Sequence, residues 1–121
     1  MKAALALAVL IATSLPAVAI EGRYKIEGRN PGQTQVYRGE AAVKKSGETY
    51  SIVWQIGSGR QIGTGILTGS VLSVVFQAAG APGSGGVASF QVNDHKITSG
   101  QWALTGGQTV GTEQWTFETG F

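Results

Sequence analysis

The stretch that decides the fold is TYSIVWQI, residues 49–56, in which apolar and polar side chains alternate without interruption. Tyr50, Ile52 and Trp54 fall on one side of an extended chain, and the small or polar residues between them fall on the other. Such a period of two predicts a β-strand with one buried face. Glycine-containing turns flank the stretch on both sides, so we expect it to pair with both neighbours in antiparallel hairpins.

The same alternation recurs outward along the chain and predicts eight short strands between residues 23 and 118. No part of 20–121 shows a helical period. We therefore expect an all-β fold, an eight-stranded antiparallel up-and-down meander that closes into a barrel, because eight strands suffice to close around packed side chains. An open barrel and a small β-sandwich stay as alternatives. The Ala, Gly, Pro and Ser run at 78–86 predicts the longest loop.

Closure of the meander has an electrostatic consequence. If the last strand pairs with the first, outward-facing Glu118 comes to lie beside Arg23 and Lys25. Exposed pairs of this kind contribute only about 0.2–1 kcal/mol each, so they indicate strand register more than stability.

Aromatic side chains dominate the expected interior. They are numerous enough to fill an eight-stranded barrel, yet such a barrel can also hold one small ligand, so a filled core and a ligand cavity both stay open. Glycines inside strands, such as Gly100 and Gly111, predict bends or rings that pack on bare backbone. The aromatic residues expected to point inward are Tyr24, Tyr37, Tyr50, Trp54, Phe76, Phe90, Trp102 and Trp115.

The N-terminal segment has the pattern of a secretory signal peptide. Lys2 precedes an apolar run at 3–12, and Ala17-Val18-Ala19 supplies a small-residue cleavage site. The apolar run is about half the roughly 20 residues that a membrane-spanning helix needs. We therefore expect a signal peptide at 1–19, a single β-barrel domain at 20–121, and export to the periplasm or the exterior without a membrane anchor.

Composition excludes several kinds of chemistry. The chain has no cysteine, which rules out disulfides, a lipoprotein anchor and thiolate metal sites. Its formal net charge is +2, and the basic residues of the first half alternate with glutamates, which is typical of a solvated face and not of a nucleic-acid site. The one histidine, His95, lies in a predicted turn. We expect no enzyme activity, no metal and no cofactor.

Glu113 breaks the pattern of polar residues facing outward. It alternates with Trp115 and so is expected to face the interior, where a carboxylate must be paired, hydrogen-bonded or protonated. Two interpretations follow. Glu113 is either a structural latch to backbone amides, to a tyrosine hydroxyl such as that of Tyr50 or to an arginine of a closing loop, or a group that binds a ligand or acts as an acid or base. If the barrel holds a ligand, the candidate binding residues are Tyr50, Trp54, Trp102, Glu113 and Trp115.

The order of motifs resembles a group of small exported alphaproteobacterial proteins. The shared features are Y-x-I-x-G-x-N-P-G at 24–32, Y-x-I-x-W at 50–54, G-x-W at 100–102 and G-T-E at 111–113. Many members carry the label "fibronectin-binding protein", which implies an extracellular matrix protein as partner. Many also carry cysteines near the third and fourth strands; this chain lacks them, so the resemblance implies no disulfide here. A more distant resemblance is to calycins, the lipocalin-type and avidin-type barrels.

Two functions are therefore expected. The first is an exported, non-enzymatic binding or structural protein that contacts a host or matrix protein by its outer surface. The alternative is a carrier that binds a small apolar ligand inside the barrel. The sequence leaves the partner and the oligomeric state open.

Overall fold

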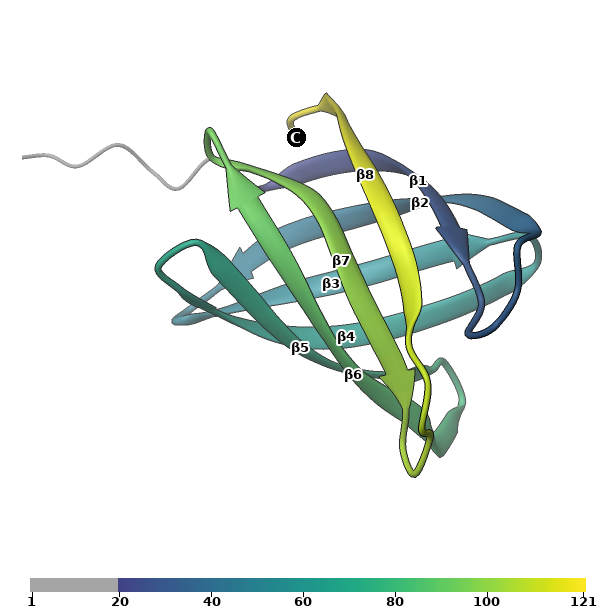
Figure 1. The fold of residues 1–121 in the computed structure, drawn as a ribbon. Coiled ribbons are helices and arrows are strands. Elements are labelled where there is room, and N and C mark those ends of the chain that lie inside the picture. Colours follow the sequence, from purple (N-terminus) through teal and green to yellow (C-terminus); the bar gives the residue numbers. More distant parts are fainter. Residues whose placement is uncertain (1–19) are drawn as a thin grey trace, which may run out of the picture.

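The computed structural model describes residues 20–121, which form a closed antiparallel barrel (Figure 1). Each strand pairs with the next in the chain, and β8 pairs with β1, so the sheet in this region has no free edge. The prediction of an eight-stranded up-and-down barrel is confirmed. The predicted signal peptide at 1–19 lies outside the described residues and stays a prediction. The strands are β1 (Gly22–Arg29), β2 (Val36–Ser46), β3 (Thr49–Ile56), β4 (Gly59–Thr68), β5 (Val71–Ala78), β6 (Ala81–Asn93), β7 (Lys96–Leu104) and β8 (Gly111–Thr119).

The closing pair of strands brings the ends of the domain together. Lys25 Nζ lies 3.2 Å from a carboxylate oxygen of Glu118, as expected for a barrel in this register. Arg23 pairs with Thr119 in the ladder, and its guanidinium lies over the ring of Phe121 at 5.2 Å from the centroid. The prediction that Glu118 lies beside Lys25 is thus confirmed. Arg23 contacts an aromatic ring instead.

The predicted loop at 78–86 is wrong. β5 continues to Ala78 and β6 begins at Ala81, so the connection is a tight turn with Gly80 at a φ of +79°. The small residues let this segment pair as a strand. The backbone of β7 approaches Gly86 so closely that a Cβ there would collide with it. Pro82 is tolerated because it lies before Gly86, the first residue of β6 that pairs with β7. No hydrogen bond to β7 therefore needs a backbone N–H at this position.

The barrel interior is built from the predicted aromatic side chains. Tyr24, Tyr50, Trp54, Phe90 and Trp115 are buried, and the other three predicted rings are half-buried against them. Rings also pack on strand glycines, as expected: a Cβ on the glycine at 100 or 111 would collide with the aromatic side chain beside it. The sequence pattern therefore assigned the faces of the strands correctly.

Candidate functional site

One end of the barrel is closed by a buried plug. Ile20 and Tyr24 are fully buried there, and Ile97 is nearly so. The Tyr24 hydroxyl donates to the Ile20 carbonyl at 2.8 Å and accepts from the Ile97 backbone N–H at 3.3 Å. These bonds tie the segment before β1 to β7, so apolar side chains fill this end.

The opposite end holds a cavity of about 330 Å³. Its walls include Trp54, Phe76 and Trp102, whose rings meet edge to face with centroids 5.9 Å and 6.2 Å apart. Phe90 and Tyr37 also line it, so five of its lining residues are aromatic. The interior therefore combines both expected arrangements: a filled core toward the closed end and a cavity toward the open one.

The carboxylate of Glu113 lies at this cavity, and it is 4 % exposed. One oxygen accepts from Trp115 Nε1 at 2.8 Å and Trp54 Nε1 at 3.2 Å, and the other accepts from the Tyr37 hydroxyl at 2.6 Å. The Tyr37 oxygen in turn accepts from Trp102 Nε1 at 3.1 Å. All three tryptophans of the chain thus donate, directly or through Tyr37, toward one carboxylate.

Two glycines make this arrangement possible. Gly28 of β1 and Gly100 of β7 are the ladder partners of Glu113 on either side. A Cβ at Gly28 would collide with the ring of Tyr37, and one at Gly100 would collide with the ring of Phe90. Tyr37 reaches Glu113 from β2, two strands away, because its ring lies flat on the bare backbone of β1.

Burial governs the ionisation of the site. Loss of hydration raises the pKa of Glu113, and the hydrogen bonds from Tyr37, Trp115 and Trp54 oppose that rise. Burial and the neighbouring carboxylate also raise the pKa of the Tyr37 hydroxyl, so it stays protonated and acts as a donor. Glu113 is therefore the group of the cavity that can gain a proton as the pH is lowered.

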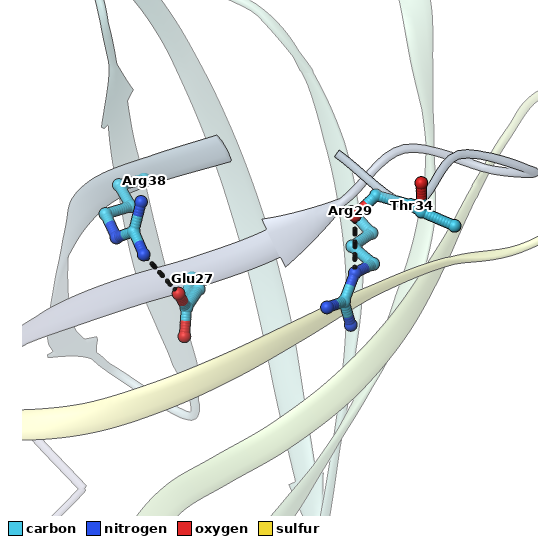
Figure 2. A network of polar contacts seen from close by, with 4 residues as sticks. All are labelled: Glu27, Arg29, Thr34 and Arg38. Carbon is cyan, nitrogen blue, oxygen red and sulfur yellow. Dashed lines mark hydrogen bonds and ion pairs between the residues drawn. The ribbon is translucent and has the colours of Figure 1, made fainter. Parts of the chain in front are cut away.

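Two polar contacts lie at β1 and β2, close to the connection between these strands. Figure 2 shows Arg29 donating from Nε to the Thr34 carbonyl at 3.1 Å and Arg38 paired with Glu27 at 2.7 Å. Asn30, within the connection that Arg29 bridges, contributes to the cavity lining. Both contacts are exposed, so they add little to global stability.

The structure separates the candidate ligand-binding residues into three groups. Trp54, Trp102 and Glu113 line the cavity together. Trp115 lies behind Glu113, where it donates to the carboxylate and packs on Phe90 with centroids 4.8 Å apart. Tyr50 lies near the β2–β3 turn, toward the closed end of the barrel. It does not line the cavity, and it is not one of the hydrogen-bond donors to Glu113.

Among the contributors to the site that sequence reasoning missed are Tyr37, Phe76 and Gln61. Tyr37 and Phe76 were expected only as core residues, yet Tyr37 is the donor to the second carboxylate oxygen and Phe76 joins two tryptophans of the wall. Gln61 also lines the cavity, and its Oε1 is buried without a hydrogen-bond partner. The glycine opposite Tyr37, at 28, was the available signal, because it lets a large side chain cross the strand.

The remaining candidate group lies elsewhere. His95 is exposed in the β6–β7 turn toward the closed end, with a φ of 63°. Within residues 20–121 no group of three or more His, Cys, Asp or Glu side chains is placed to hold a metal ion, and no helix of that region is long and apolar enough to cross a membrane. No protein-family profile and no curated protein matches the chain.

Proposed function

We propose that this protein binds small, largely apolar molecules in the open end of its barrel and serves as a carrier for them. The observation that supports this is the cavity of about 330 Å³ beside a buried carboxylate. Ligand pockets in proteins typically occupy about 300–1,000 Å³ and combine apolar walls with a few fixed polar groups. The aromatic walls would bury the body of the ligand, and Glu113 with Gln61 would orient it.

Export is part of the same proposal. The signal peptide predicted at 1–19 and the resemblance to small exported alphaproteobacterial proteins support a carrier that works in the periplasm or outside the cell. The absence of cysteine agrees with a domain that depends on its core and barrel closure for stability.

The test is a binding titration with a neutral apolar fluorophore such as N-phenylnaphthylamine, read by energy transfer from tryptophan. Ala88 is buried in the cavity wall, so Ala88→Leu should fill the space and weaken binding. Ala103 faces outward between two cavity-lining residues of β7, so Ala103→Leu is the matched control and should bind as the wild type does. Equal binding by both variants would refute a site inside the barrel.

Binding by the outer surface is the second candidate. Val75 and Val87 are ladder partners on β5 and β6, each about 60 % exposed, and Ile62 lies nearby on β4. A hollow of about 450 Å³ adjoins two of them, Ile62 and Val75. If a matrix protein such as fibronectin docks on this face, Val75→Lys should abolish its capture in a surface-binding assay. Retained capture, or none by the wild type, would exclude this face.

A further inference from the structure

The charge of Glu113 is not balanced within the cavity. It is the one charged side chain among the buried residues of 20–121. None of the residues that line the cavity is a lysine, an arginine or a histidine. A buried carboxylate is normally paired with a cation, because removing its hydration costs several kcal/mol. The site therefore holds a carboxylate that is hydrogen-bonded but has no cation among the residues that line the cavity.

The hydrogen-bond donors around Glu113 fit its ionised form. Indole N–H groups can only donate, and Trp54 and Trp115 both donate to one carboxylate oxygen. The Tyr37 hydroxyl donates to the other, while its own oxygen accepts from Trp102. A carboxylate has about four acceptor positions, and these three donors occupy three of them.

The walls favour positive charge as well. The face of an aromatic ring carries negative potential, and cages of such rings bind alkylated ammonium groups. Trp54, Phe76 and Trp102 line the cavity, and Tyr37 and Phe90 add two further rings. The arginines closest to this end, Arg29 and Arg60, are exposed and alternate with inward residues, so solvent and salt screen them from the interior.

We propose that the cavity selects small organic cations, in which an ammonium group with apolar substituents lies against Glu113 and the aromatic walls. The inference rests on the proposed carrier function and adds the class of ligand. Carboxylate ligands are excluded by the same reasoning, because they would place a second negative charge beside a buried one.

The decisive test compares two compounds of one shape on the wild-type protein. Choline carries a trimethylammonium group. Its neutral analogue, 3,3-dimethylbutan-1-ol, carries a tert-butyl group at the same position, because carbon replaces the nitrogen. Each is titrated into isotope-labelled protein, and the indole N–H signals of the three tryptophans are followed by NMR. We expect choline to shift these signals and to bind about tenfold or more tightly than its analogue.

The outcomes separate the two proposals. Equal affinity of choline and its analogue overturns cation selectivity and leaves the carrier function standing. Tighter binding of the analogue, or of benzoate, also overturns it. If neither compound shifts the indole signals and N-phenylnaphthylamine does not bind, the carrier function fails together with the inference.

A variant identifies the responsible group. Glu113→Gln keeps the shape of the side chain: its oxygen can accept from both indoles, and its amide can donate to Tyr37. This variant should bind choline and the neutral analogue equally. Glu118→Gln on the outer face of the same strand is the matched control and should keep the preference. A preference retained by Glu113→Gln would contradict the assignment.

The pH dependence supplies a third readout. Choline does not titrate, and Tyr37 is the other titratable residue that lines the cavity; its pKa is raised, so it stays neutral. Burial raises the pKa of Glu113, so choline affinity should fall as pH is lowered through that value. Binding of the neutral analogue should stay constant over the same range, and a parallel loss of both would contradict a charge effect.

Discussion

Removal of one hydroxyl group, by Tyr37→Phe, tests whether the carboxylate network exists as described. The phenyl ring that remains would still lie on Gly28, so packing is retained. The variant loses the 2.6 Å bond to Glu113, and a hydrogen bond to a charged group contributes about 1.5–3 kcal/mol. It also removes the acceptor for Trp102, which costs about 0.5–1 kcal/mol because this indole is half-buried and water can replace the bond. We expect a loss of about 2–4 kcal/mol in the free energy of unfolding at neutral pH.

The assay is urea denaturation at neutral and at acidic pH. The loss should shrink in acid, because a protonated Glu113 no longer provides a charged acceptor. The pKa of Glu113 should rise further in the variant, since one of the donors that lower it is gone. Tyr50→Phe, at the other end of the barrel, is the matched control and should leave the pKa of Glu113 unchanged. A loss below about 0.5 kcal/mol at neutral pH, or equal losses at both pH values, would refute the network.

Three further predictions concern the same barrel. Because the folded state raises the pKa of Glu113, its contribution to stability is present below the ordinary value of 4.5 and is lost as pH rises through the folded pKa. The melting temperature of ligand-free Glu113→Gln should not show this loss as the pH rises. If the variant lost as much as the wild type, the pH dependence would belong to another group. Tyr24→Phe should destabilise the domain by about 1–3 kcal/mol in urea, since the buried Ile97 N–H loses its acceptor; a neutral result would remove Tyr24 from the plug. Gly28→Ala should displace Tyr37 and destabilise by about 1–3 kcal/mol, and an unchanged indole N–H spectrum would contradict that steric reasoning.

The sequence predicts the architecture because period-two alternation depends only on which face of a strand is buried. The faces of TYSIVWQI and of its seven counterparts follow from that rule, and eight such strands leave closure as the arrangement without free edges. The loop expected at 78–86 fails for a local reason. Its small residues are typical of loops, but here they allow strands to approach closely, which composition alone does not distinguish.

The site is predicted only in part because hydrogen-bond partners depend on register across several strands. Alternation shows that Glu113 points inward, and the structure confirms it. It does not show that Tyr37, distant in sequence by 76 positions, lies over Gly28 and reaches the same carboxylate. Tyr50 faces inward as expected, yet its position along the barrel axis places it at the closed end, and axial position is set by strand stagger.

A network of this kind is difficult to explain as a requirement of folding. An apolar residue in place of Glu113 would leave a closed barrel with a plug at one end, and replacement of buried charges by apolar side chains is often neutral or stabilising. The burial that raises the pKa of Glu113 means that the ionised group costs stability while the cavity is empty. A bound cation would remove that cost, so ligand binding should raise stability most at the pH where Glu113 is ionised. The carboxylate lies beside the cavity and not at the filled end with Tyr24, which supports the proposed binding site over a purely structural latch.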